Sequence, residues 1–164
     1  MKSMHLHAQM KVILIGSTLL VLTAVSCKTS EVVSGPANCE TGVLEGADLS
    51  FRDVLPGVDG PLQRERTYFI QGKPAMATET VTQWWLVTDS VSTPLRPLPP
   101  LSDTLRWSGI RNFYAPNSTE ATTAVQASRP FAVGVGFWLI EERDKGCRAY
   151  ALPKARHLET LALP

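Results

Sequence analysis

Histidine is the first residue type to test for chemistry, because most metal and acid–base sites in proteins use it. The chain has three histidines. His5 and His7 precede a hydrophobic N-terminal segment, which leaves His157 as the one histidine in the rest of the chain. That part of one chain therefore cannot form a metal or catalytic site that needs two histidines. No Gly-x-Ser-x-Gly motif accompanies His157, so it is interpreted as a solvated surface residue rather than as the base of a nucleophile.

The carboxylates form no recognisable pair. Glu141 and Glu142 are neighbours at the end of an apolar strand-like segment, so their side chains should point to opposite faces. We interpret them as the charged end of that strand, which discourages edge pairing. Asp48, Asp53 and Asp59 lack the spacing of an EF-hand loop. The sequence therefore predicts no catalytic residue, no metal ligand and no cofactor.

Two glycines at alternate positions, Gly134 and Gly136, suggest a dinucleotide motif at first sight. The third glycine of that motif would fall at Leu139, and the segment has the alternation of a strand rather than of a loop before a helix. The fingerprint therefore fails. We predict instead that Gly134 and Gly136 leave a shallow groove on one sheet face, which a ring, a backbone or a ligand could approach.

Trp84 and Trp85 are the strongest candidates for a contact residue. They are neighbours in a segment rich in β-branched and aromatic residues, so we expect them on opposite faces of a sheet. If one face is exposed, one tryptophan lies at a binding surface, where this residue type is enriched. The alternative is that both sheet faces are covered and both rings are core.

An apolar segment near the N-terminus gives the predicted location. Val12 to Val25 is 14 residues long, which is shorter than the ~20 residues of a spanning helix and typical of a signal peptide. Lys2 and Lys11 supply its positive flank, and Thr23-Ala24-Val25-Ser26-Cys27 ends it. Translation from Met1 or from Met10 would leave the same mature chain.

These residues resemble the signal peptide and lipobox of a bacterial lipoprotein. The resemblance covers residues 10–28 and implies a signal peptide over 1–26, lipidation of Cys27, and a membrane anchor of acyl chains. Lys28 stands where enteric lipoproteins retained in the inner membrane have Asp, which favours the outer membrane. The alternative is an ordinary secretory signal in which Cys27 is a spare thiol. Under the lipoprotein interpretation, residues 27–38 are a short, polar, lipidated tether.

The other two cysteines are predicted to form a disulfide. Lipidation of Cys27 leaves Cys39 and Cys147, and an exported protein folds in an oxidising compartment. The alternative is two buried free thiols. All 15 acidic residues follow the leader, as do all but two of the 16 basic ones, so the mature surface is nearly neutral. This balance gives no electrostatic case for binding nucleic acid.

The segments after residue 39 have strand patterns and frequent turn signals, which indicates a single β-rich domain over 39–164. Strands are expected around residues 67–70, 75–88, 105–114, 131–142 and 147–152, with the last two joined as a hairpin by a charged turn at 143–146. Residues 94–100 hold four prolines and are expected to be an extended connection. Short helices are expected at 117–126, capped by Asn117, and at 154–162. The predicted fold is a mainly β antiparallel sandwich or small barrel, with α+β as the alternative.

Three functions follow from these patterns. The first is a non-enzymatic envelope lipoprotein, anchored in the outer membrane and facing the periplasm, that binds an envelope protein or a cell-wall component near Trp84 or Trp85. The second is a carrier that holds a small apolar ligand at the Gly134 and Gly136 face. The third is an envelope hydrolase that uses carboxylates distant in sequence, although no motif indicates such a pair. The oligomeric state stays open.

Overall fold

The structure, a computed structural model, describes residues 38–57, 62–76, 80–88, 91–127, 131 and 136–163. The chain divides into two compact units, Met1–Glu31 and Val32–Pro164, and every described residue belongs to the second. The predicted signal peptide, Cys27 and Gly134 therefore lie outside the described residues. Among the described residues, no helix is both long enough and apolar enough to cross a membrane.

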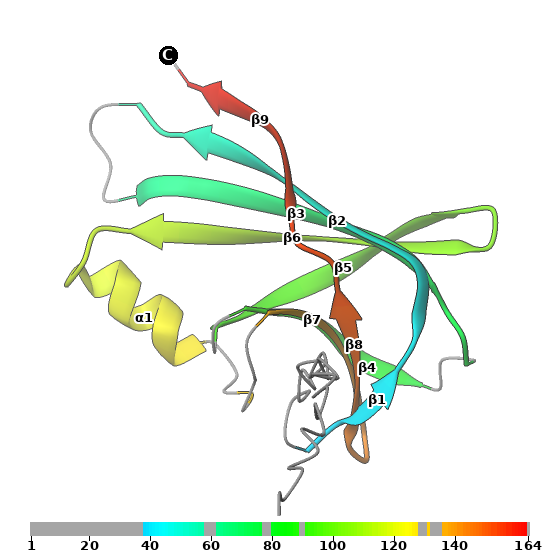
Figure 1. The fold of residues 1–164 in the computed structure, drawn as a ribbon. Helices are drawn as coiled ribbons and strands as arrows, with labels where there is room; N and C mark the ends of the chain where they lie inside the picture. Colours follow the sequence, from blue (N-terminus) through cyan, green and yellow to red (C-terminus); the bar gives the residue numbers. More distant parts are fainter. Residues whose placement is uncertain are drawn as a thin grey trace, which may run out of the picture. The chain divides into compact units, whose positions relative to one another are not determined.

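Strands dominate the described residues, which confirms the prediction of a mainly β fold (Figure 1). Within the same described ranges, a single short helix lies between the sixth and seventh strands. The elements are β1 Glu40–Gly42, β2 Leu44–Leu55, β3 Leu62–Pro74, β4 Val81–Thr88, β5 Val91–Leu101, β6 Thr104–Tyr114, α1 Thr119–Ala127, β7 Phe137–Arg143, β8 Cys147–Leu152 and β9 Arg156–Ala162.

The strands form one sheet of mixed direction in the order β1-β8-β7-β4-β5-β6-β3-β2-β9. Most neighbours are antiparallel, but β1 runs parallel to β8, and β2 runs parallel to β9. The chain passes directly from β1 to β2 and from β8 to β9, so these two long segments lie side by side through both halves of the sheet (Figure 1). The sheet does not close, which agrees with a sandwich rather than with a barrel.

Two apolar clusters hold this arrangement together. The larger one joins the two halves of the sheet, with Leu49 and Trp107 from one half and Leu86 and Leu139 from the other. The smaller cluster, Val87, Trp138, Ile140 and Ala149, covers the opposite face of β4, β7 and β8. Alternate residues of β4 and β7 thus serve different clusters, because successive side chains of a strand point to opposite faces.

The proline-rich segment was wrongly predicted as a connection, because it is the second half of β5. Residues 91–95 of β5 pair with β4, whereas residues 96–98 pair with β6. β5 therefore carries the chain from one half of the sheet to the other. Each part of the strand has a ladder on one side alone, and proline is tolerated on such a one-sided strand.

The C-terminal segment was also predicted wrongly, as a helix. Residues 156–162 form β9, whose backbone pairs with β2, and all seven side chains are exposed. The apolar residues of 154–162, although spaced as in a helix, therefore do not form a buried helical face.

Two details of the predicted helix and hairpin are corrected. Helix α1 is present, but Asn117 has a positive φ of 66° and Ser118 is the cap, since its Oγ accepts a hydrogen bond from the backbone N–H of Ala121 at 3.0 Å. The β7–β8 hairpin is confirmed, with the N–H of Arg143 donating to the carbonyl of Gly146 at 3.1 Å. Strand β7 begins at Phe137, whereas Phe131 lies outside any strand and residues 132–135 lie outside the described residues.

Candidate functional site

A cleft opens where β5 leaves β6. β6 continues beyond the point of parting, and its residues 109–114 pair with β3 on one side. On the other side, no strand among the described residues pairs with them, because β5 has turned toward β4. The helix α1 lies against this last part of β6 (Figure 1). The space bounded by β5, β6 and α1 has a volume of about 440 Å³.

Gly109 stands at the apex of the cleft, where the two strands are still in contact. A Cβ atom at this position would lie 2.7 Å from the carbonyl oxygen of Pro94 and 2.7 Å from Cδ2 of Leu95. A side chain here would force the strands apart, so the close approach of β5 requires glycine.

The walls of the cleft are mostly apolar. Strand β5 contributes Val91 and Pro94, and α1 contributes small residues that leave the space open. The full lining is Val91, Ser92, Thr93, Pro94, Ile110, Arg111, Asn112, Phe113, Tyr114, Ala121, Ala124 and Val125. Arg111 is the one charged residue in it. Sites for small molecules have this composition, with apolar walls and a few polar groups that fix orientation.

Arg111 belongs to a cationic cluster around Phe113. The guanidinium carbons of Arg64, Arg111 and Arg66 lie 4.5, 4.8 and 5.4 Å from the centroid of the Phe113 ring. Such positions over an aromatic face are favourable cation–π contacts. We call Arg64, Arg66, Arg111 and Phe113 the arginine cluster.

The arginine cluster has one carboxylate partner among the described residues, Asp53. The Nε and Nη2 atoms of Arg66 donate to the two oxygens of Asp53 at 2.6 and 2.8 Å, and Arg64 approaches the same carboxylate at 3.5 Å. The hydrogen bond from Arg66 holds the pKa of Asp53 below its ordinary value of 3.8, and burial offsets part of this shift. Arg111 donates to the hydroxyl of Thr88 at 3.0 Å instead.

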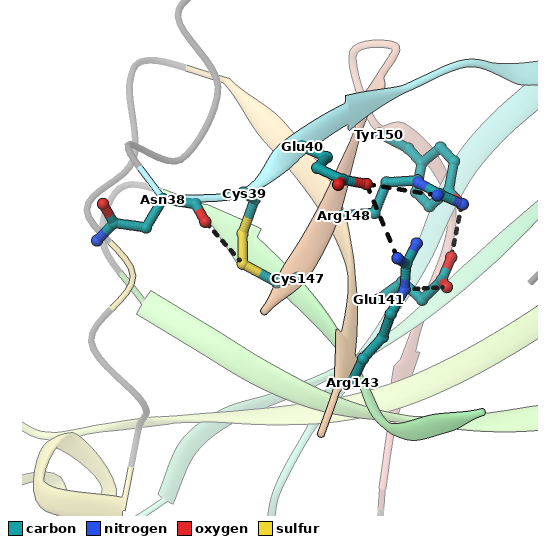
Figure 2. Close-up of polar contacts among 8 residues, drawn as sticks. All are labelled: Asn38, Cys39, Glu40, Glu141, Arg143, Cys147, Arg148 and Tyr150. Carbon is teal, nitrogen blue, oxygen red and sulfur yellow. Dashed lines mark hydrogen bonds and ion pairs between the residues drawn. A yellow bond between two sulfur atoms is a disulfide. The ribbon is translucent and has the colours of Figure 1, made fainter. Parts of the chain in front are cut away.

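A second charged cluster lies toward the opposite end of β4 and is shown in Figure 2. The carboxylate of Glu141 is fully buried, accepting a hydrogen bond from the Tyr150 hydroxyl at 2.6 Å and from Nε of Arg143 at 2.9 Å. Arg143 and Arg148 also approach Glu40 of β1, at 3.8 and 3.4 Å. We call these five residues the glutamate cluster. Burial, followed by the hydrogen bond to Glu141, raises the pKa of Tyr150 to about 12.

The glutamate cluster corrects the interpretation of Glu141 and Glu142. Strand β7 lies between β8 and β4, so neither glutamate protects a sheet edge. They do point to opposite faces, as expected. Glu141 faces the large core, whereas Glu142 accepts a hydrogen bond from the indole N–H of Trp85 at 2.7 Å.

The disulfide predicted between Cys39 and Cys147 is present and lies beside the glutamate cluster (Figure 2). It joins the start of the domain to β8, with Cα atoms 4.7 Å apart. The bridge thereby holds β1, which carries Glu40, against the strand that carries Arg148.

The predicted binding residues do not converge on one site. Trp84 is buried in the large cluster, 4.8 Å from Trp107 between ring centroids, and Trp85 is half-buried on the other face against Phe131. Gly136 has a positive φ of 121°, lies just before β7 and is not among the residues that line the cleft. His157 is exposed, as its interpretation required, and contacts the Phe51 ring and Thr160.

Sequence reasoning missed the arginine cluster, although a signal was present. Arg64 and Arg66 alternate with Tyr68 along one strand, and Arg111 alternates with Phe113 along another. The two-residue spacing places each set on one face. The two sets lie on the same face of the sheet because β3 pairs with β6. This pairing brings Arg66 opposite Arg111 and Arg64 opposite Phe113.

Comparisons with protein-family models, with curated proteins and with solved structures found no match to this chain. Within the described part of the chain, no group of three or more His, Cys, Asp or Glu side chains has a metal-binding arrangement.

Proposed function

We propose that the protein is a non-enzymatic lipoprotein of the bacterial cell envelope that binds a small apolar ligand in the cleft between β5, β6 and α1. The sequence offered two binding functions, a contact near Trp84 or Trp85 and a carrier of an apolar molecule. Trp84 is core and Trp85 is half-buried against Phe131, so the first function has a smaller exposed aromatic surface than the sequence suggested. The cleft favours the second, although it lies on β5 and β6 and not at Gly136.

The cleft itself is the observation that carries this proposal. Two other hollows of similar volume, about 400 and 490 Å³, have mostly polar and charged linings, the first with Asp48, Arg52, Arg106 and Arg156 and the second with Thr80, Arg143, Asp144 and Lys145. At the parting of β5 from β6, by contrast, about 440 Å³ lies between apolar walls. This volume falls within the ~300–1,000 Å³ range of small-molecule sites.

The chemistry of the lining supports binding rather than catalysis. The described residues that line the cleft include no carboxylate, histidine or cysteine. The two buried carboxylates of the part of the chain that the structure describes, Asp53 and Glu141, are held by arginine and tyrosine donors. General acid–base catalysis in the cleft would need a carboxylate or a histidine in its lining, and Asp53 and Glu141 are already engaged by other side chains.

The membrane anchor remains a prediction from the sequence, because Cys27 and most of the tether lie outside the described residues. Cys27→Ala should release the protein from the membrane or leave it unprocessed. Mass spectrometry of the membrane fraction checks this, and an unchanged acylated mature protein would contradict the lipobox.

A protein partner is the second candidate function, and one observation favours it. β9 is an edge strand whose seven residues are all exposed. An extended segment of another envelope protein could pair with its free side. Such a partner would be lost on Leu158→Pro, which removes a backbone donor from β9, and kept on substitutions in the cleft.

Native mass spectrometry of the protein extracted from its own envelope in mild detergent tests the leading proposal. We expect a small molecule to co-purify with the wild-type protein. Ala124→Trp places a bulky ring in the cleft and should abolish co-purification. Ala162→Trp makes the same change on exposed β9 and is the matched control. A ligand retained by the Ala124→Trp variant would overturn the assignment of the cleft.

A further inference from the structure

We propose that the ligand of the cleft is a single-chain amphiphile with an anionic head, and that Arg111 binds the head. This inference rests on the proposed function, because it names the ligand class of the same cleft. It begins from a charge imbalance. Arg64, Arg66 and Arg111 surround one ring, and Asp53 is their one carboxylate partner among the described residues.

The register of the sheet makes the imbalance costly for the protein alone. Arg66 and Arg111 are directly opposite each other on antiparallel strands. Like charges in this position repel and destabilise a sheet. Asp53 compensates Arg66 with two hydrogen bonds, whereas Arg111 has a neutral hydroxyl, that of Thr88. An anion beside Arg111 would complete the compensation.

Arg111 is also the arginine of the cluster that lines the cleft, where it can bind the head of a ligand whose chain lies between the apolar walls. Arg111 and Phe113 both line the cleft. A guanidinium has five N–H donors in a planar fork that matches a carboxylate or a phosphate. With one donor on Thr88, Arg111 keeps others for a head group, and its guanidinium packs against the Phe113 ring.

The rest of the cleft suits a hydrocarbon chain. Ala121, Ala124 and Val125 of α1 line the space together with Val91, Pro94 and Ile110. A volume of about 440 Å³ is near the lower end of the range for small-molecule sites, which favours one acyl chain over the two of a phospholipid. The head group at Arg111 would then occupy the charged part of the cleft, and the hydrocarbon chain along α1 would occupy the apolar part.

The test uses photo-crosslinking of the full-length protein in its own membranes, with a diazirine-bearing decanoic acid at a subsaturating concentration. We expect adducts on α1 and on residues 91–94 of β5. Decanoate and decyl phosphate should compete, and their relative potency identifies a carboxylate or a phosphate head. Decanol and decyltrimethylammonium, which lack the negative charge, should compete at least tenfold less well.

Two substitutions on β6 complete the test. Arg111→Gln should lower the adduct yield about tenfold, the effect of losing a charged hydrogen bond at a partly exposed site. Arg106→Gln lies on the same strand but outside the cleft, and should leave the yield unchanged. Arg111→Lys keeps the charge and should recover part of the labelling, which separates loss of the head-group contact from a folding defect.

The two levels of the proposal fail differently. If decanol competes as well as decanoate, or if Arg111→Gln labels like the wild type while Ala124→Trp abolishes labelling, the anionic head is overturned and the apolar cleft stands. If Ala124→Trp leaves the labelling unchanged, the cleft is not the site, and the proposed function fails together with the inference.

Discussion

Two charged clusters lie toward opposite ends of β4, and they differ in their balance of charge. In the glutamate cluster, Glu40 and Glu141 face Arg143 and Arg148 in equal numbers, and the disulfide lies beside them. In the arginine cluster, three guanidiniums surround Phe113, and Asp53 pairs with Arg64 and Arg66 but not with Arg111. Glu141, at the centre of the glutamate cluster, is inaccessible to solvent, although Glu40 at its margin is exposed, whereas Arg111 lines an open cleft.

The difference separates a structural role from a binding role. A buried carboxylate is tolerated when donors satisfy its oxygens, and its loss leaves an uncompensated charge behind. The glutamate cluster meets this condition internally. The arginine cluster does not, since its excess positive charge faces solvent and the cleft. We therefore expect substitutions in the glutamate cluster to change stability, and substitution of Arg111 to change ligand binding.

The disulfide should give the largest effect. Cys39→Ala with Cys147→Ala opens a loop with a sequence separation of 108 residues, which lowers the free energy of unfolding by about 4–5 kcal/mol on the chain-entropy model. Urea unfolding followed by the fluorescence of the four tryptophans measures this loss. Reductant should have the same effect on the wild type and none on the double variant. Loss of photolabelling in the double variant under folding conditions would show that the two ends are not independent.

Glu141→Gln should be the most damaging single substitution of a charge. It leaves Arg143 beside a buried neutral amide, and removal of one partner of a buried ion pair costs about 3–5 kcal/mol. Glu45→Gln, on the exposed part of β2, is the matched control and should cost no more than ~0.5 kcal/mol. Equal unfolding midpoints in urea for both variants would contradict the structural role of the glutamate cluster.

Asp53→Asn tests the shared carboxylate of the arginine cluster. We expect a loss of about 2–3 kcal/mol at pH 7, because Arg66 loses two hydrogen bonds to a charged acceptor. The pKa of Asp53 is lowered on folding, so its contribution is complete above 3.8 and is lost as the pH falls through the lower folded-state pKa. The stability difference between wild type and variant should therefore stay constant from pH 7 to about 4 and shrink below it. A difference that grows on acidification would contradict the assigned shift.

Local patterns predicted a large part of this molecule. Three features could be predicted from the sequence: the opposite faces of Trp84 and Trp85, the charged turn of the β7–β8 hairpin, and the pairing of two cysteines. The first two depend on a few neighbouring residues, and the third follows from the oxidising compartment expected for an exported protein. The predicted helix at 154–162 failed because a pairing with β2, distant in sequence, supplies the backbone hydrogen bonds of β9. The proline-rich segment failed because its one-sided pairing in the sheet could not be read locally.

The candidate site was harder to predict than the fold. The arginines of β3 and β6 had the right spacing, but the register that places Arg66 opposite Arg111 is a contact across 45 residues of sequence. The cleft depends on the same long-range geometry, since it exists because β5 changes partners between residues 95 and 96. Glu141 and Glu142 were correctly expected on opposite faces, but Tyr150 of β8, which donates to Glu141, becomes its neighbour only in the folded sheet.

The most direct measurement is urea unfolding of the wild type and of the Arg111→Gln variant, each with and without decanoate below its micelle-forming concentration. Without decanoate, the two free energies of unfolding should agree within ~0.5 kcal/mol, because the lost bond to Thr88 is offset by relief from Arg66. At a hundred times the wild-type Kd, decanoate should stabilise the wild type by about 2.7 kcal/mol and the variant, with tenfold weaker binding, by about 1.4 kcal/mol. A variant that loses several kcal/mol without decanoate, or that gains as much from it as the wild type does, would contradict the assignment of Arg111 to ligand binding.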